Sequence, residues 1–229
     1  MRKRLHIRRQ PSDETCGPTC LAAVYNFYQD PVSLESVIDE VQMLEEGGTL
    51  APLLGIHSLS RGYEAEIYSF NIKIFDPAWF GFSDKKLIKK LTLQIATPKN
   101  RKTISVCKAY RKFLKKGGRI RFADLTREFL SEKLAAGPII CGLSSTYLYK
   151  ASRENPRTNR PDDVRGEPAG HFVVLANAQD HQVEILDPYF PNPVSSGQKG
   201  MVAIDHLINS VLLGVITYDA NLLIIRKKQ

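Results

Sequence analysis

The sequence lacks the features of a secreted, disulfide-linked or membrane-spanning protein. Its 229 residues include only four cysteines, without regular spacing, so no disulfide framework is predicted and a reducing compartment fits. The basic N-terminus is not followed by the apolar stretch of a signal peptide. The longest apolar run, Val211–Ile216, is far shorter than a membrane span. We therefore expect a cytoplasmic protein that makes no use of a membrane.

The sequence also lacks the close pairs of ligand residues that are typical of a metal site. The cysteines and histidines do not form the close pairs of a zinc site, so we expect no metal and no other cofactor.

Between Lys85 and Arg121 there are fourteen lysines and arginines and no acidic residue, within a chain of net charge +8. We interpret this basic segment first as a solvated face, then as a surface for an acidic partner or substrate. A nucleic-acid surface comes last, because few aromatic residues interleave with the charges.

Hydrophobic periodicity predicts helices early in the chain and mainly strands later, which favours the α+β class. With 43% hydrophobic residues, the chain has enough apolar side chains for one large core. We expect a single domain over residues 1–229, with a helical part at about 10–118 and a β-rich part at about 119–229. Helices are predicted at 16–28, 33–44, 50–60, 85–93, 104–116, 124–136 and 205–212, and strands at 63–70, 120–122, 139–143, 171–176, 182–186 and 221–226.

A polar loop runs directly into the first predicted helix, with Cys16 at the junction. A thiol at a helix N-terminus is close to the positive end of the helix dipole and to unpaired backbone N–H groups, and both stabilise its thiolate. Gln10, six positions upstream, can lie beside the thiol and donate an amide N–H to a developing oxyanion. This combination is what acyl-transfer chemistry on a thiol requires. Cys20, one turn deeper in the same helix, is interpreted as a core residue.

Two later segments supply the groups that would activate such a thiol. His171 opens a predicted apolar strand, and Asp187 closes the next one, directly before a proline. Each residue alone has an ordinary interpretation: a small buried hydrophobe for the cysteine, an edge residue for the histidine, and a turn for Asp-Pro. Their occurrence together, in the order Cys16, His171, Asp187, predicts one nucleophilic site.

These segments resemble the C39-type, papain-like cysteine peptidases. The resemblance rests on Gln10, on Cys16 with the glycine after it, and on the strand contexts of His171 and Asp187. It implies a papain-like fold in which an N-terminal helical part packs on a C-terminal antiparallel sheet. It also implies that Cys16 is the nucleophile, His171 the base, Asp187 the residue that orients it, and Gln10 the oxyanion donor. Because no transporter segment is present, a free-standing domain is expected.

The resemblance implies a thiol hydrolase that cleaves a peptide or isopeptide bond in a peptide or protein substrate. Alternatives are an acyltransferase with the same triad, a non-catalytic peptide-binding module and, on the basic segment alone, a nucleic-acid-binding protein. The polar segment 152–169 ends beside His171 and is interpreted either as the border of the cleft or as a surface excursion. In the first case Arg160 and Arg165 would face the substrate, and the positive charge would favour an acidic one.

Overall fold

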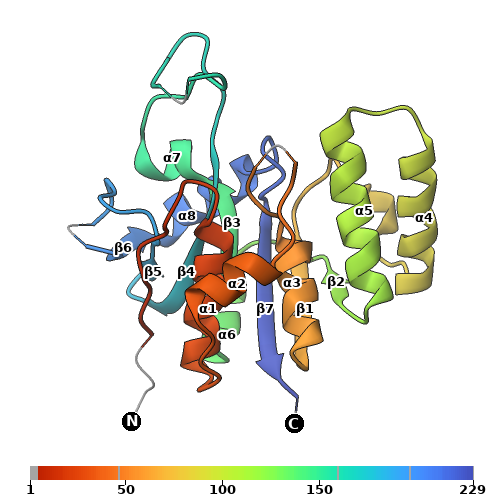
Figure 1. Cartoon of the computed structure of the whole chain (residues 1–229), viewed down its shortest axis with the longest axis horizontal. Coiled ribbons are helices and arrows are strands. Elements are labelled where there is room, and N and C mark those ends of the chain that lie inside the picture. The colour runs from red at the N-terminus through yellow and green to blue at the C-terminus, as the bar shows by residue number, and fades with distance from the viewer. Residues whose placement is uncertain (1–4, 46, 159, 196, 229) are drawn as a thin grey trace.

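A seven-stranded β-sheet organises the computed structural model, which describes residues 5–45, 47–158, 160–195 and 197–228 (Figure 1). The strand order is β2-β1-β7-β3-β4-β5-β6. Neighbouring strands are antiparallel except for β1 and β2, which are parallel. The strands are β1 (Tyr63–Ser69), β2 (Arg119–Arg121), β3 (Ile139–Ser144), β4 (Gly170–Gln179), β5 (Gln182–Leu186), β6 (Lys199–Ala203) and β7 (Asn221–Lys227).

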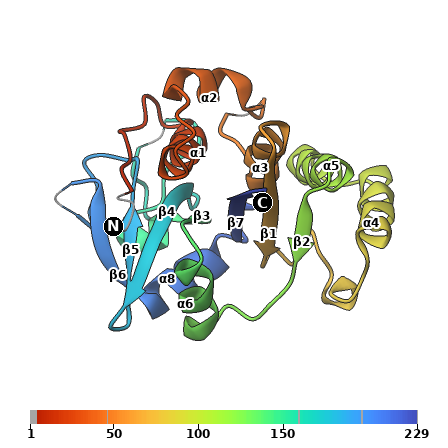
Figure 2. The same cartoon turned by 90° about the horizontal axis from the view of Figure 1, so that it is seen from below.

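Helices cover both faces of this sheet, and the predicted α+β class is confirmed. Figure 2 shows α1, α2 and α3 on one side of the strands and α6 and α8 on the other. The helices are α1 (Cys16–Phe27), α2 (Leu34–Glu40), α3 (Ala51–Ser60), α4 (Asp84–Ala96), α5 (Arg101–Lys115), α6 (Arg127–Ala135), α7 (Ser145–Tyr149) and α8 (Ile204–Leu213), with a short 3₁₀ helix at Pro77–Trp79. None of the helices that the structure describes combines the length and the apolar character needed to cross a membrane.

The last strand, β7, has apolar residues at consecutive positions because both of its faces are buried. Leu223 and Ile225 belong to the core beneath α1, α3 and α5, whereas Leu222 and Ile224 belong to a second core beneath α6 and α8. Successive side chains of a strand point to opposite faces, so a strand buried on both faces needs apolar residues at every position. The sheet therefore separates two hydrophobic cores.

Helix α1 is buried over most of its length and is tied to its neighbours by polar contacts. The Cys20 thiol donates to the carbonyl oxygen of Phe172 in β4 at 3.3 Å. At the other end of α1, the Tyr25 hydroxyl lies 2.8 Å from His57 Nδ1 in α3, and His57 Nε2 lies 3.1 Å from Glu40 Oε2 in α2. The buried Cys20 thiol, Tyr25 hydroxyl and His57 ring are thus all paired, and they hold α1 against β4 and α3. The exposed Glu40 carboxylate connects α2 to α3.

The basic segment forms the hairpin of α4 and α5 at one edge of the sheet, beyond β2 (Figure 1). Cys107, Tyr110 and Leu114 are buried, as the helical spacing predicts, and Ile104 is half-buried. The lysines and arginines lie mostly on the remaining surface of the two helices. This is the arrangement of an amphipathic helix whose apolar stripe faces the core.

Several boundaries and elements differ from the sequence-based expectation. At one end, α4, α5 and β4 each extend three residues beyond the predicted range. Helix α2 ends at Glu40 instead of continuing to residue 44, because the next residue, Val41, is extended and buried in the core. Helix α6 begins three residues later than predicted, with the Thr126 hydroxyl accepting from the Phe129 N–H. The sequence did not predict α7, which is only five residues long, or β6, an edge strand in which only Val202 is buried. In addition, β1 comes from the part of the chain predicted as helical, so strands of the sheet come from both predicted parts.

Candidate active site

Cys16 is the first residue of α1, as the sequence predicts. A tight turn sets this helix start: the Ser12 N–H donates to the Thr15 hydroxyl at 3.1 Å, and the Thr15 N–H donates to the Ser12 carbonyl at 3.2 Å. The Cys16 side chain is 9% exposed and lines a cavity of about 210 Å³ that His171 also lines. The thiol therefore lies at a helix N-terminus and at the edge of a cavity, where a helix dipole stabilises negative charge.

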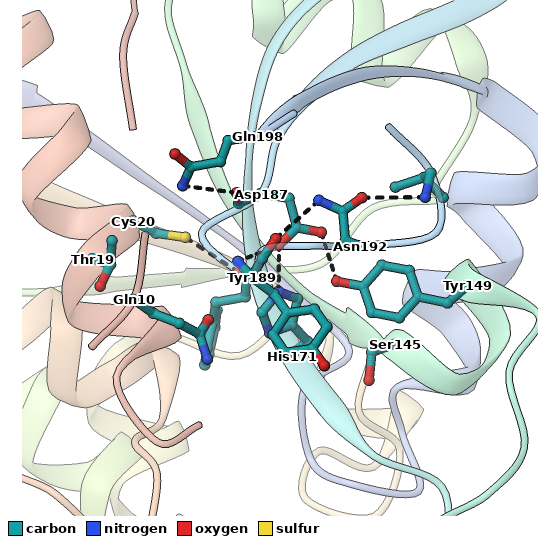
Figure 3. A network of polar contacts seen from close by, with 12 residues as sticks. Gln10, Thr19, Cys20, Ser145, Tyr149, His171, Asp187, Tyr189, Asn192 and Gln198 are labelled. Atoms are coloured by element: carbon teal, nitrogen blue, oxygen red, sulfur yellow. Dashed lines mark hydrogen bonds and ion pairs between the residues drawn. The ribbon is translucent and has the colours of Figure 1, made fainter. Parts of the chain in front are cut away.

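His171 lies in β4, and Asp187 directly follows β5, the adjacent antiparallel strand. Because Val174 pairs with Leu186, Asp187 comes next to Val173, which is two residues from His171 and on the same face of β4. The imidazole Nε2 donates to Asp187 Oδ1 at 2.8 Å (Figure 3). Because Nε2 is occupied by the carboxylate, Nδ1 is the ring nitrogen left for another partner.

The Asp187 carboxylate is almost fully buried, at 1% exposure, and is satisfied by three donors. Besides His171, the Tyr189 backbone N–H donates to Oδ1 at 2.9 Å, and the Tyr149 hydroxyl donates to Oδ2 at 2.6 Å. Three donors on a buried carboxylate are the usual way to keep such a group charged inside a protein. The carboxylate is therefore fixed in position and can orient the imidazole.

The proton affinity of His171 depends on these neighbours. Burial lowers the pKa of the imidazole, but its hydrogen bonds and charge interactions with Asp187 and Cys16 outweigh burial and raise the pKa to about 10. The imidazolium form is thus stabilised at neutral pH, with a carboxylate on one side and a thiol on the other. A protonated imidazole beside a thiol at a helix start is the arrangement of an activated sulfur nucleophile.

Gln10 is buried and attached to the same site from the N-terminal segment. Its backbone N–H donates to the carbonyl of Pro188, the residue after Asp187, at 2.9 Å. Its side-chain Nε2 donates to the Ser12 carbonyl at 2.9 Å, and its Oε1 has no hydrogen-bond partner among the described residues. Figure 3 shows this side chain extending toward His171. The structure therefore brings together all four residues that the sequence singles out.

Cys20 is a core residue, as its position in α1 predicts. It has no exposed surface, and burial raises the pKa of its thiol well above the ordinary value, with Cys16 and Asp187 raising it further. Cys107 and Cys141 are also fully buried, and burial raises the pKa of each. Cys16 is thus the thiol that borders the cavity.

Two residues of the site were missed by sequence reasoning. Tyr149, the last residue of α7, is held over Asp187, and its ring stacks on that of Tyr189 with centroids 6.2 Å apart. Burial and the carboxylate both raise the pKa of Tyr149, so its hydroxyl remains a donor. The sequence feature that could have predicted α7 is Ser144, whose hydroxyl accepts a hydrogen bond from the Tyr147 N–H and caps this short helix.

Asp219, the second missed residue, precedes β7 and lines the cavity that contains Cys16 and His171. It is 8% exposed. A Cβ atom at Gly170 would collide with its carboxylate, so the glycine before His171 provides the room that Asp219 occupies. Burial raises the pKa of Asp219 to about 7, against the opposing influence of Thr217 and the nearby positive groups. A buried carboxyl with a raised pKa in a cleft is a frequent feature of functional sites.

The two predicted substrate-binding arginines do not line this cavity. Arg160 and Arg165 lie exposed on the segment between α7 and β4, which rises beyond α7 in Figure 1. Arg165 Nε donates to Asp162 Oδ2 of the same segment at 3.2 Å. Only the end of the segment, at Pro168 and Gly170, borders the cavity. A substrate role for the two arginines stays a prediction that receives no support from their positions.

Charged side chains of both signs line the cavity. Asp13 and Glu14 contribute carboxylates, Asp219 contributes a carboxyl whose pKa is raised to about 7, and Lys102 and the His171 imidazolium contribute positive charge. Among the described residues, no group of three or more His, Cys, Asp or Glu side chains is arranged to hold a metal ion. Cys16 and His171 line one cavity, and together such groups can perform nucleophilic attack by sulfur with proton transfer through the imidazole.

No family model and no curated protein matches the chain. Three solved structures are similar to it over almost all of its length. The first is a double glycine motif protease from an AMS/PCAT transporter in complex with the leader peptide (15% identity, TM-score 0.48). The second is the peptidase domain of Streptococcus ComA, which is a bifunctional ABC transporter involved in a quorum-sensing pathway (12% identity, TM-score 0.49). The third is a C39-like peptidase from Bacillus anthracis (13% identity, TM-score 0.49). The alignments cover 99%, 98% and 99% of this chain and 94%, 100% and 96% of those chains.

All three structures are peptidases or peptidase domains, the kind of protein that the sequence resembles. Similarity at 12–15% identity and TM-scores below 0.5 is too distant to assign the chain to their family. The function proposed below therefore depends on the geometry of the site.

The substitution Tyr149→Phe tests the contact on Asp187. It removes one donor from a buried carboxylate, and we expect the free energy of unfolding to fall by about 1.5–3 kcal/mol. Tyr189→Phe is the matched control, because Tyr189 reaches Asp187 through its backbone N–H, which the substitution keeps. Urea unfolding of both variants measures the effect. Equal losses in the two variants would contradict the assignment.

The substitution Asp219→Asn tests the buried carboxyl. Its pKa is raised in the folded state, so the folded protein holds this proton more tightly, and stability falls as the pH rises from about 4 to about 7. We expect the variant to match wild type near pH 4 and to exceed it at pH 8 by up to about 4 kcal/mol. Denaturant unfolding at the two pH values measures this difference. Asp13→Asn, at an exposed carboxylate of the same cavity, serves as the control, and a gain from Asp219→Asn that is independent of pH would refute the prediction.

Proposed function

We propose that the chain is a cysteine peptidase, a thiol hydrolase that cleaves a peptide or isopeptide bond. One observation carries the proposal: Cys16, at the N-terminus of α1, shares a cavity with His171, whose other ring nitrogen is held by buried Asp187. Nucleophile, base and orienting carboxylate are the three groups that acyl transfer through a thiol requires. The resemblance of the sequence to C39-type peptidases points to the same reaction.

In the proposed reaction, the proton of Cys16 rests on His171 before substrate binds. The thiolate sulfur attacks the scissile carbonyl carbon and forms a tetrahedral oxyanion. Its negative charge is stabilised by the Gln10 amide and by a backbone N–H at the start of α1. The carbon–nitrogen bond then breaks, the amine leaves with the proton from His171, and the acyl group remains on sulfur as a thioester. Water, deprotonated by His171, then attacks the thioester, the carbon–sulfur bond breaks, and the acid leaves while the Cys16 thiolate and the His171 imidazolium are restored.

The cavity also indicates which residues it accepts next to the scissile bond. Its small volume of about 210 Å³ favours short side chains.

The reactivity of Cys16 tests the nucleophile. We expect iodoacetamide at pH 6 to add one label to the native protein, because only Cys16 borders the cavity and the other three thiols have no exposed surface. Intact-mass spectrometry counts the labels: one in wild type and in Cys20→Ala, and none in Cys16→Ala. His171→Ala should slow labelling by about 10²-fold or more, with circular dichroism checking that the variant is folded.

New peptide termini generated from a digest of cellular proteins then measure hydrolysis. We expect them with wild type and not with Cys16→Ala, and adding an amine such as glycinamide tests acyl transfer in the same reaction. Slow labelling of Cys16 and Cys20 at the same rate would end the proposal. If Cys16 is labelled but neither new termini nor amide products form, the peptidase proposal is contradicted and a peptide-binding module is favoured.

Gln10→Ala separates the oxyanion role from the reactivity of the thiol. Alkylation forms no oxyanion, so we expect the rate of Cys16 labelling to remain within about twofold of wild type, whereas turnover falls by about 10²–10³-fold. The measurement compares the two rates on the same preparation. If labelling and turnover decline in parallel, Gln10 acts by holding the N-terminal segment through its bond to Ser12, and the oxyanion assignment is wrong.

A further inference from the structure

The turn between α8 and β7 carries a carboxyl group into the candidate active-site cavity. Thr217 and Asp219, two residues of this turn, line the cavity together with Cys16 and His171. The Asp219 carboxyl lies against Gly170, where a Cβ atom would collide with its Oδ2 atom. Because Gly170 directly precedes His171 in β4, Asp219 lies beside the base of the proposed reaction without belonging to the triad.

Hydrogen bonds on both sides of Asp219 fix its backbone. Its N–H donates to the Gly214 carbonyl at 2.8 Å, and its own carbonyl accepts from the Asn221 N–H at 2.7 Å. The preceding residue, Tyr218, is buried in the core, and its hydroxyl lies 2.7 Å from the Thr103 hydroxyl of α5. The turn is therefore held at several points, and the carboxyl keeps a fixed position beside the cavity.

Tyr218 also has a left-handed backbone conformation, with a φ of 74°. A bulky side chain rarely adopts this conformation, because its Cβ atom approaches the following carbonyl oxygen. Such strain persists only where the surrounding structure enforces it, and it is concentrated at functional positions. Here it accompanies a change of environment between two successive residues, since Tyr218 packs in the core and Asp219 lines the cavity.

The Asp219 carboxyl is buried without a counter-charge. It is 8% exposed and forms no ion pair with any residue that the structure describes. Burial raises its pKa to about 7, although Thr217, Lys102 and His171 act in the opposite direction. Near neutral pH the carboxyl therefore exists in both its charged and its neutral form. A polar group that bonds to it in the cavity replaces the hydrogen bonds to water that burial removes.

A hydroxyl group has the chemistry that best suits this carboxyl. It donates to the ionised form and accepts from the neutral form, so it bonds to both. An ammonium group bonds only to the ionised form, and Lys102 and the His171 imidazolium in the lining would repel it. An apolar side chain would leave the buried carboxyl without a hydrogen bond. The cavity volume of about 210 Å³ also suits a side chain as small as that of serine or threonine.

We propose that Asp219 determines substrate specificity by hydrogen-bonding to the hydroxyl of a serine or threonine that lies beside the scissile bond. The side chain of this substrate residue enters the cavity bordered by Cys16 and reaches the carboxyl that lies against Gly170. The role rests on the function proposed above. Because Asp219 exchanges no proton with the scissile bond, its replacement changes the choice of substrate instead of abolishing cleavage.

Cleavage of a digest of cellular proteins, with the new termini identified by mass spectrometry, tests this choice. We expect serine and threonine to be enriched at one position beside the sites that wild type cleaves. Asp219→Asn should keep the preference, because a carboxamide also donates to and accepts from a hydroxyl. Asp219→Leu should replace it with a preference for alanine or valine. Asp13→Asn, at an exposed carboxylate of the same cavity, is the control and should keep the wild-type preference.

A pair of synthetic peptides gives the size of the effect. In a peptide that wild type cleaves, exchanging the selected serine for alanine should lower kcat/KM by about tenfold or more, because the buried carboxyl loses its partner. With Asp219→Leu the same exchange should change kcat/KM by less than about threefold. Should circular dichroism show that Asp219→Leu is unfolded, Asp219→Ala takes its place. Wild type that cleaves both peptides equally well overturns the proposal without any variant.

Labelling of Cys16 by small thiol reagents tests the cavity without peptide cleavage. Hydroxyethyl and propyl methanethiosulfonate are both neutral and differ by a hydroxyl in place of a methyl group. Relative to their rates with glutathione, we expect wild type to favour the hydroxyethyl reagent by about fivefold or more, and Asp219→Leu to lose this preference. A larger preference for the cationic aminoethyl reagent would identify a site for ammonium groups and overturn the hydroxyl assignment.

Cleavage and labelling together separate this proposal from the proposed function. If no peptide is cleaved but Cys16 prefers the hydroxyethyl reagent, the peptidase function fails, while the selection of hydroxyl groups by Asp219 stands. If peptides are cleaved without a preference for serine or threonine, the specificity proposal fails while the function stands.

Discussion

The close packing of the first turn of α1 against the sheet is the constraint on which the site depends. A Cβ atom at Gly17 would lie 2.6 Å from Thr49 Cγ2 and 3.2 Å from Leu54 Cδ1, so a residue without a side chain lets the first turn of α1 pack closely against the start of α3. One turn later, the hydrogen bond from the Cys20 thiol to the Phe172 carbonyl holds α1 against β4. Because Phe172 follows His171 in β4, seating α1 here places Cys16 beside the imidazole.

The buried carboxylate of Asp187 connects this contact to the rest of the molecule. Its donors come from β4, from α7 and from the backbone after β5, and the next residue, Pro188, accepts a hydrogen bond from the Gln10 N–H. A buried charge is stable only while its partners stay in place, so the three segments that supply the donors are coupled through one carboxylate. The same network raises the pKa of His171, which links the packing of the protein to the protonation of the site.

Charge is distributed over the surface in a way that net charge does not show. The cations of α4 and α5 lie beyond β2 at one edge of the sheet, while side chains of both signs line the cavity beside Cys16. Lys102, on α5, also lines that cavity. The formal charge of +8 therefore reflects mainly the edge formed by α4 and α5 and does not describe the site.

Local patterns in the sequence determined the helix that starts at Cys16, the strands that carry His171 and precede Asp187, and the order of these groups along the chain. Such features depend on neighbours within a few residues, through capping, periodicity and turns. Only the tertiary structure decided that Tyr149 and Asp219 complete the site, that Arg160 and Arg165 lie outside it, and that β7 separates two cores. These outcomes depend on contacts between segments far apart in the chain, and no local pattern encodes which distant side chain fills a given space.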